Sequence, residues 1–314
     1  MRVQLTVRKS NPERGGLPYF QDYSVEAGRG TSLLSALLKI KEEVDGTLTF
    51  RASCRAAICG SCLMQVNGIQ KLACKTPLQE EFRRHGKITV GPMANMPVIK
   101  DLVVRMDPFW EKIKAITPYV KQKPEPSPPE QLQNLHEQLH NADGCIMCGA
   151  CLSACPSFEV SPRFLGPAAL AKSYRFQVDP RDGAHADRLQ ALQEPDGIWD
   201  CVRCNFCVQV CPKDVQPMEQ IIRLRRMSLT TGLSQSVPAR HITEFIKVVK
   251  EEGRLNEVRL PILMTWGHWG KMLRIFPLGL KMLFHGKVPF PFKWLPGRQA
   301  IRAIFDIQSK RNRV

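Results

Sequence analysis

Residues 144–158 read GCIMCGACLSACPSF, and residues 204–217 read CNFCVQVCPKDVQP. Together with Cys201, the second stretch repeats the pattern of the first, four cysteines spaced CxxCxxCxxxCP. This spacing is typical of bacterial two-cluster ferredoxins, in which the fourth cysteine of each run ligates the cluster of the other run. The duplication is the only internal repeat that the sequence shows, and it predicts a domain that holds two four-iron clusters.

The crossing of the fourth cysteines predicts two ligand sets that each join distant segments of the chain. The first set is Cys145, Cys148, Cys151 and Cys211, and the second set is Cys155, Cys201, Cys204 and Cys207. Each cluster would then staple the two runs together, so loss of iron should strongly destabilise the domain. Pro156 and Pro212 follow the fourth cysteines, and we expect each to begin a helix, where a missing N–H is no loss.

A third group of cysteines lies nearer the N-terminus, beginning in RASCRAAICGSC at 51–62. Its members are Cys54, Cys59, Cys62 and Cys74. Three close thiolates and a fourth from a following strand are typical of the two-iron loop of plant-type ferredoxins. Gly60 and Ser61 let backbone N–H groups approach the sulfides, and such hydrogen bonds raise the reduction potential. A structural zinc site is the alternative, although zinc loops usually pair two CxxC knuckles.

The twelve cysteines fall into these three groups, which leaves no thiol for nucleophilic chemistry. The chain opens MRVQLTVRKS, without the basic and apolar regions of a secretory signal, so we expect synthesis in the reducing cytosol. Disulfides are rare there, and metal ligation becomes the leading role for cysteines. No GxGxxG or phosphate-binding loop occurs, so neither FAD nor a nucleotide is expected in this chain. His136 and His140 share a polar helical face, which we interpret as solvated rather than metal-binding.

The overall prediction is an α+β fold. Residues 1–100 predict a β-grasp ferredoxin-like domain, because an early strand pair, a helix capped near Thr31 and Ser32 and the strand KITV at 87–90 accompany the two-iron loop. Residues 101–130 predict a linker. Its stretch KQKPEPSPPE at 121–130 has four prolines in ten residues, which favours an extended, semi-rigid connector.

The remaining sequence predicts two further segments. Residues 131–237 predict an all-α domain with the two four-iron clusters, because hydrophobic residues recur with helical spacing and strand signals are nearly absent. Residues 238–314 predict a basic C-terminal extension, with 15 Lys and Arg against 5 Asp and Glu.

The charge and hydropathy patterns limit the choice of partners. The formal net charge is +16, and well over half of it lies in the C-terminal extension. No apolar run reaches the roughly 20 residues that a membrane-spanning helix needs, so any membrane association should be peripheral. The Met, Phe and Trp residues between 262 and 294 lie among basic residues and fit either a membrane interface or a core edge. A zinc-bearing nucleic-acid binder would also use the basic charge, but it would be colourless.

Several motifs together resemble the iron–sulfur subunit of succinate dehydrogenases and fumarate reductases. The motifs are SCRAAICGSC, LAC at 72–74, GCIMCGACLSACPSF, FLGPAAL, DPRDG and CNFCVQVCPKDVQP. They occur in the family's order over residues 1–230. The resemblance implies one [2Fe-2S] and two further clusters that carry electrons in series, with no substrate-oxidising site in this chain.

The resemblance also implies partners. A flavoprotein subunit would carry FAD and oxidise succinate or reduce fumarate, and a membrane anchor would exchange electrons with quinone. The complex would lie peripherally on the cytoplasmic face of the cell membrane, and no nucleic acid is expected as a partner. The alternative is the iron–sulfur subunit of a related oxidoreductase, such as a thiol-dependent fumarate reductase with a heterodisulfide-reductase-like partner.

Three positions depart from the common family pattern. Most members lack a thiol at the position of Cys204 and hold a three-iron cluster, so Cys204 places this chain with an atypical subset that has a second four-iron cluster. Val160 and Val202 stand where most members have the tryptophan and histidine of the quinone site. The stretches GRLNE at 253–257 and HGKVPF at 285–290 resemble extensions of that subset, whose anchor is often cysteine-rich and heterodisulfide-reductase-like.

Overall fold

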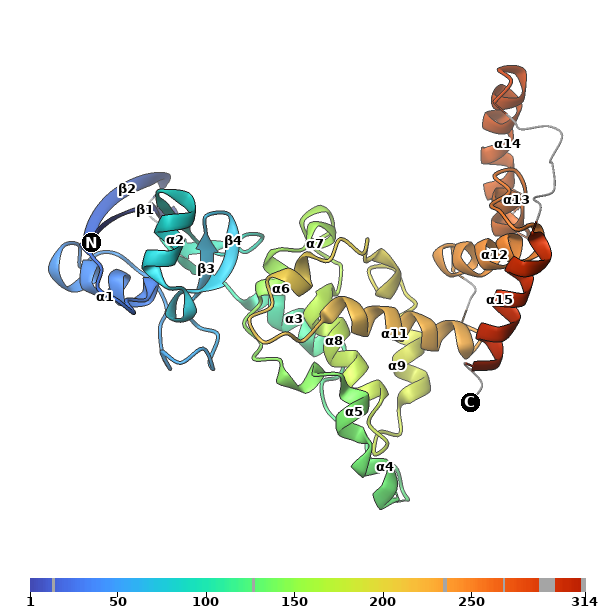
Figure 1. Ribbon diagram of the computed structural model, residues 1–314, viewed down its shortest axis with the longest axis horizontal. Helices are drawn as coiled ribbons and strands as arrows, with labels where there is room; N and C mark the ends of the chain where they lie inside the picture. Colours follow the sequence, from blue (N-terminus) through green and yellow to red (C-terminus); the bar gives the residue numbers. More distant parts are fainter. Residues whose placement is uncertain (13–14, 126–127, 234–235, 268, 288–296, 312–314) are drawn as a thin grey trace. The chain divides into compact units, whose positions relative to one another are not determined.

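The computed structural model describes residues 1–311 except 13–14, 126–127, 234–235, 268 and 288–296. The chain divides into two compact units, residues 1–226 and residues 227–314 (Figure 1). The first unit contains all twelve cysteines. Within it we distinguish an N-terminal half, residues 1–106, and a helical half, residues 107–226.

A five-stranded mixed sheet forms the N-terminal half. Its strands are β1 (Arg2–Asn11), β2 (Gly16–Glu26), β3 (Leu63–Val66), β4 (Ile69–Leu72) and β5 (Ile88–Gly91), in the spatial order β2-β1-β5-β3-β4. Alternate residues of β1 point into the core, and Val3, Leu5 and Val7 are fully buried. β1 runs antiparallel to β2 and parallel to β5, which places the short hairpin of β3 and β4 at one edge.

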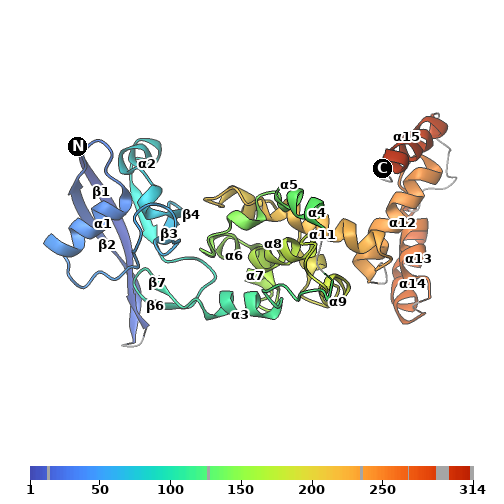
Figure 2. The same ribbon diagram turned by 90° about the horizontal axis from the view of Figure 1, so that it is seen from below.

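Helices complete the core of this half. α1 (Leu33–Glu43) begins after Ser32, whose Oγ accepts a hydrogen bond from the Ser35 N–H at 3.1 Å. It buries Leu33, Leu37 and Ile40 and lies beside β1 and β2 in both ribbon views (Figure 2). A second helix, α2 (Leu78–His85), precedes β5. The mixed α and β composition predicted from the sequence is confirmed.

The segment predicted as a linker, residues 101–130, is partly folded. It contains β7 (Val103–Val104), which pairs with β6 (Val98–Lys100), and the helix α3 (Asp107–Ala115). Phe109 and Ile113 lie one turn apart on α3 and are only 1% and 5% exposed. This apolar pair packs α3 into the unit, so the structure places the start of the connector after α3.

The connector itself is tied to the helical half. The Arg188 guanidinium donates hydrogen bonds to the carbonyl oxygens of Ile116, Thr117 and Tyr119 at 2.6–3.0 Å. Asp182 accepts hydrogen bonds from Arg188 and from the Lys121 N–H. Burial by itself would raise the pKa of Asp182, but these hydrogen bonds outweigh it and the net pKa is lowered. Residues 116–121 therefore form a fixed strap.

The helical half is built around one buried helix. Its helices after α3 are α4 (Pro129–Gln133), α5 (Leu135–Leu139), α6 (Ala150–Ser153), α7 (Pro156–Val160), α8 (Gly166–Gln177), α9 (His185–Ala191), α10 (Phe206–Gln209) and α11 (Pro217–Thr230). α8 is buried along most of its length. A Cβ on Gly166, at the start of α8, would lie 2.2 Å from Leu152 Cδ1 of α6 and would displace that side chain, and the φ of +81° also favours glycine here.

The two prolines that follow the fourth cysteines behave differently. Pro156 begins α7, as expected. Pro212 does not begin a helix, and the expectation there is wrong. The chain turns instead, with positive φ at Asp214 and Gln216, and the next helix begins at Pro217. Left-handed backbone at those two residues is incompatible with a helix that begins at Pro212.

The second unit contains the helices α12 (Val237–Glu252), α13 (Arg259–Thr265), α14 (Trp269–Phe284) and α15 (Arg298–Arg311). The unit begins inside α11, slightly before the predicted start of the C-terminal extension at residue 238. Residues 288–290 of HGKVPF lie outside the described residues. Among the described helices, none combines the length and the apolar character that crossing a bilayer requires.

Candidate metal centres

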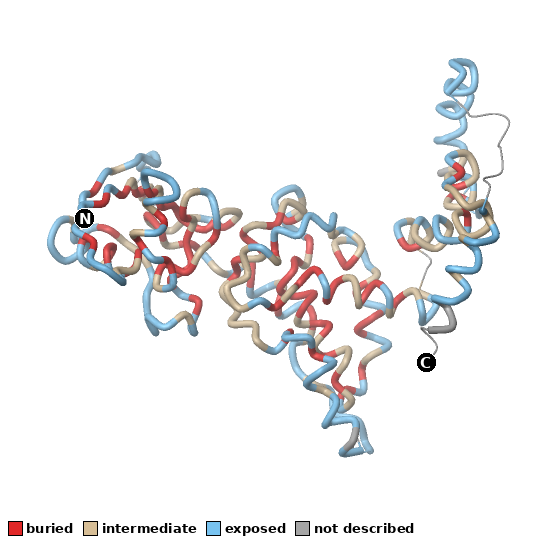
Figure 3. Tube along the Cα trace, viewed as in Figure 1, coloured by how far each residue is buried: buried red, intermediate tan, exposed pale blue. Residues whose placement is uncertain are grey.

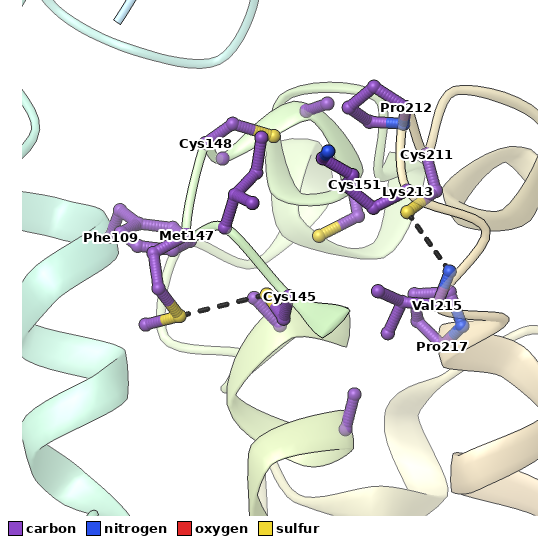
Figure 4. A pocket seen from close by; sticks show the side chains of 15 residues that line it. Phe109, Cys145, Met147, Cys148, Cys151, Cys211, Pro212, Lys213, Val215 and Pro217 are labelled. Atoms are coloured by element: carbon purple, nitrogen blue, oxygen red, sulfur yellow. Dashed lines mark hydrogen bonds between the residues drawn. The ribbon is translucent and has the colours of Figure 1, made fainter. Parts of the chain in front are cut away.

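One cavity brings together the cysteines of the first predicted four-iron set. Cys145, Cys148, Cys151 and Cys211 line about 400 Å³ of empty space, part of which is open to solvent (Figure 4). Three of these cysteines come from the loop before α6 and from α6 itself, and Cys211 comes from the second run. The Cys211 Sγ accepts a hydrogen bond from the Val215 N–H at 3.4 Å, which fixes the returning thiol.

The four thiols of this cavity are a donor set that fits an iron–sulfur cluster. Across the described part of the chain, no three His, Cys, Asp or Glu side chains lie close enough to hold one metal ion. Sulfurs that surround a cluster of several irons are farther apart than sulfurs on one ion. Burial raises the pKa of Cys148 to about 11 and that of Cys151 well above its usual value. Such thiols become thiolates only beside bound cations, as in iron–sulfur sites.

The members of the second predicted set also lie close to one another. Burial is the main cause that raises the pKa of Cys207 to about 12, and the nearby Cys201, Cys155 and Cys204 contribute to the increase. Burial likewise raises the pKa of Cys155, to which Cys201 and Cys204 add. Cys155 and Cys207 are buried and Cys204 is exposed. The structure therefore gathers four thiols from both runs here, and the set has one exposed side.

The two runs share an unusual backbone pattern. Met147 and Gly149 have positive φ in the first run, and Arg203 and Asn205 have positive φ at the equivalent positions of the second. Left-handed residues beside right-handed ones turn successive N–H groups toward one side of a loop, a concavity that binds anions and occurs at iron–sulfur sites. The repeated sequence thus produces a repeated local structure.

The third group of cysteines forms a loop rich in hydrogen bonds to sulfur. The Cys54 Sγ accepts hydrogen bonds from the N–H groups of Ala56, Ile58 and Cys59 at 3.3–3.4 Å. A hydrogen bond from the Ser61 side chain is the main cause that lowers the pKa of Cys59 to about 6. Such donors stabilise negative charge on sulfur. These hydrogen bonds would stabilise the reduced, more negative state of a cluster bound in this loop.

Cys62 and Cys74 complete this group from the edge of the sheet. Burial raises the pKa of Cys62 to about 11, and the neighbouring Cys74 contributes to the shift. Cys74 lies in a short 3₁₀ helix, Ala73–Lys75, directly after β4. The fourth thiol was expected from a strand, so its position differs by a single turn. The Ala73 N–H donates to the Cys62 carbonyl at 3.0 Å and holds the two segments together.

Gly60 joins the first cysteine loop to the next one. A Cβ on Gly60, whose φ is +74°, would lie 2.6 Å from the Cys148 Cβ, so the two loops touch through backbone and Cys148. The open space beside this contact is lined partly by Met64, Met93 and Met147. Asn95 and Ser153 fix the same junction, because Asn95 Nδ2 donates to the Ser153 carbonyl at 3.0 Å and the Ser153 hydroxyl donates to the Ala94 carbonyl at 2.8 Å.

Arg225 is a residue of the site that the sequence reading did not identify. It lies on α11 and is 6% exposed. Its guanidinium donates to the carbonyl oxygens of Ile198 and Cys201 at 2.6–2.8 Å and lies over the Trp199 ring. Nothing in the local sequence separates Arg225 from its exposed neighbour Arg226, so only the tertiary structure reveals its role.

Residues that departed from the resembled family, or were judged non-functional, all lie at the surface. Val160 and Val202 are 86% and 67% exposed. His136 lies on α5, His140 ends that helix with positive φ, and both histidines are exposed.

Comparisons with known proteins agree with this arrangement. A family model described as a 2Fe-2S iron-sulfur cluster binding domain matches residues 4–111, and one described as a 4Fe-4S dicluster domain matches residues 141–215. The fumarate reductase iron-sulfur subunit of Haemophilus influenzae is 39% identical over 233 residues, which cover 70% of this chain and 90% of that protein. The subunit of the same name from Mycobacterium tuberculosis is 39% identical over 238 residues, with coverages of 74% and 96%.

A solved structure has the same fold. A chain of the Mycobacterium smegmatis Sdh1 complex in the apo form gives a TM-score of 0.66 at 23% identity, covering 74% of this chain and 98% of that chain. The curated relatives are matched over nearly their whole length, and the two iron–sulfur domains occur in the predicted order. The chain therefore belongs to the family of iron–sulfur subunits of fumarate reductases and succinate dehydrogenases, and is an electron-transfer subunit of such an oxidoreductase.

Proposed function

We propose that this chain holds three clusters in series and connects the FAD of a flavoprotein partner with a membrane anchor that reacts with quinone. The proposed ligands are Cys54, Cys59, Cys62 and Cys74 for [2Fe-2S]; Cys145, Cys148, Cys151 and Cys211 for the first [4Fe-4S]; and Cys155, Cys201, Cys204 and Cys207 for the second. When bound, the clusters supply one-electron carriers, and the protein sets their spacing and electrostatic surroundings.

The contact between Gly60 and Cys148 is the observation that carries this proposal. It brings the two-iron loop against the first four-iron loop with no side chain in between. The next step is also short, because Cys207 of the second set lies close enough to raise the pKa of Cys151 of the first. Three ligand groups that neighbour one another in order support a single route along the chain.

Cys204 supports a four-iron rather than a three-iron centre in the second set. A cubane needs a ligand on every iron, and Cys204 supplies the fourth thiol beside Cys155, Cys201 and Cys207. Cys204 is exposed, so we expect one side of this centre to face the solvent. The anchor would then meet the chain around Cys204, where Val202 and Phe206 are exposed.

The nature of the anchor follows from the same surface. Val160 and Val202 stand where most family members have the tryptophan and histidine of the quinone site. Two valines cannot provide the hydrogen-bonding groups that those residues provide in a quinone site of the common type. We therefore propose that the acceptor is a subunit with its own redox centre, cysteine-rich and heterodisulfide-reductase-like. The complex would lie peripherally on the cytoplasmic face of the membrane.

The route can be tested at Gly60. Gly60→Ala places a methyl group against Cys148 and should separate the two loops, whereas Gly68→Ala introduces the same left-handed strain at a position with open space around it. In the assembled complex mixed rapidly with succinate, we expect the four-iron signals of Gly60→Ala to develop roughly tenfold more slowly, because a small displacement of reacting centres strongly lowers a rate.

The Gly68→Ala variant is the control for this experiment. Gly68→Ala should match the wild type, and both variants should contain about ten irons, which is two plus four plus four. Equal rates of four-iron reduction in the two variants would show that electrons do not pass at Gly60. Stoichiometric zinc with negligible iron would contradict the whole proposal.

A further inference from the structure

α14 carries an apolar stripe that the described residues of its own unit leave exposed. Trp269, Leu273, Phe276, Leu280 and Leu283 recur every three or four residues, which places them on one face of the helix. Their exposed fractions lie between 43% and 72%. The exposed surface continues along the helix in the trace coloured by burial (Figure 3). A continuous apolar face that is exposed to solvent is typical of an interaction site.

The charges on and around α14 have one sign. Arg274 and Lys281 lie two turns apart, away from the apolar stripe, and both are exposed. The sequence has no Asp or Glu between Glu257 and Asp306. An acidic surface is therefore the complementary partner of this segment.

The length of α14 and the distribution of apolar residues around it help to distinguish a protein groove from a lipid surface as the partner. The helix has 16 residues, so it is about 24 Å long and shorter than the hydrocarbon core of a bilayer, about 30 Å. Ile275, Leu278 and Met282 are also exposed, although they lie beside the cations rather than on the stripe. A groove on a partner protein would cover only one face of α14, the stripe. The lipid interface can contact a wider part of the circumference.

We propose that α14 lies in the plane of the membrane, with its stripe among the acyl chains and Arg274 and Lys281 against anionic phospholipid headgroups. Trp and Phe on the apolar face, cations on the other face and insufficient length to span are the features of an interfacial helix. This attachment needs no membrane-spanning segment. It deepens the proposed membrane association but is independent of the electron route, which the Gly60 experiment tests.

The experiment is vesicle flotation with the full, iron-loaded chain in the absence of any anchor subunit. We expect binding to vesicles that contain phosphatidylglycerol, weak binding to phosphatidylcholine alone, and a decrease with added salt. Phe276→Asp should reduce binding by at least tenfold, since burial of a Phe side chain contributes about 1.5–3 kcal/mol. Arg274→Gln and Lys281→Gln should each reduce it about fivefold.

A matched control lies on another helix of the same unit. Ile307 of α15 is 60% exposed, close to the 64% of Phe276, so Ile307→Asp adds the same charge to a similar surface. It should bind vesicles nearly as the wild type does. The proposal is wrong if protein-free vesicles do not bind the chain, or if Phe276→Asp and Ile307→Asp bind equally. Binding only to vesicles that carry the anchor subunit would instead identify a protein groove as the occupant.

Discussion

The two cysteine runs, residues 145–156 and 201–212, share a sequence pattern and a backbone but not an environment. Both have positive φ on either side of the second cysteine. The short helix within the first run, α6, buries Ala150, Leu152 and Ser153, whereas Phe206 of the equivalent helix α10 in the second run is 47% exposed. The spacing of the four cysteines therefore determines the backbone conformation of the loop, which the two runs share. The surroundings determine whether a run faces the interior or the surface.

Different contacts hold the two runs in place. The first run is packed by apolar groups, with Leu152 against Gly166 of α8 and Gly149 close to the methionines Met93 and Met106. The second run is held by the hydrogen bonds and the charge of Arg225. A buried cation beside an anionic centre also stabilises the reduced state of that centre.

The largest expected difference between the runs concerns their second cysteines. Cys204→Ser should remove the ligand of one iron and give a centre with three irons, because Cys155, Cys201 and Cys207 still hold the rest. We expect the iron content to fall by about one atom and an oxidised three-iron EPR signal to develop. The loop should stay folded, since Cys204 is exposed.

The matched variant is Cys148→Ser in the first run. Cys148 is more buried and touches Gly60, so its replacement should disturb the junction with the two-iron loop as well as the ligand set. Succinate should then reduce the second set slowly in Cys148→Ser and at nearly the normal rate in Cys204→Ser. If anaerobically isolated wild-type protein already shows the three-iron signal at full occupancy, the ligand role of Cys204 is wrong.

A smaller effect is expected at Arg225. Arg225→Met keeps the volume but leaves the Ile198 and Cys201 carbonyls without their donor, which should destabilise the second run by about 2–4 kcal/mol. The potential of its centre should fall, because a positive charge is lost. Iron release in guanidinium and EPR-monitored redox titration measure the two effects. Arg226→Met, on an exposed position of the same helix, should change neither.

The smallest effect is expected in the two-iron loop, from a substitution that should leave both four-cysteine runs unchanged. Ser61→Ala removes the side-chain hydrogen bond that lowers the pKa of Cys59. A hydrogen bond to a charged group contributes about 1 kcal/mol or somewhat more, so the potential of the two-iron centre should fall by roughly 40 mV for one electron. Redox titration measures the shift. An equal shift in the four-iron centres would show that the effect is not local to this loop.

The sequence predicted the features that depend on local spacing. The positions of the three cysteine groups, the early strand pair and the helix after Ser32 could be read from the chain, because each rests on residues close together in sequence. The resemblance to the iron–sulfur subunit family is confirmed by relatives at 39% identity. The ligand assignments of individual cysteines stay predictions.

Features that depend on distant residues could not be read in this way. The predicted linker contains α3, although Pro108 near the start of this helix and the spacing of Phe109 and Ile113 are signals of a short helix. The contact of Gly60 with Cys148 joins segments far apart in sequence, and no local pattern announces it. The strap held by Arg188 is similar, since its partners are backbone carbonyls that any residues would provide.

The cavity in Figure 4 also imposes an order on the synthesis of the protein. Three of its cysteines lie between residues 145 and 151, but Cys211 comes from the second run. Chains leave the ribosome from the N-terminus, and domains fold as they emerge. The cysteines of the two-iron loop are complete once Cys74 has been made, and their sheet is complete at Gly91. The first proposed four-iron set gains its last cysteine only when Cys211 emerges, so the two-iron set is complete, and able to accept iron, before the first four-iron set is.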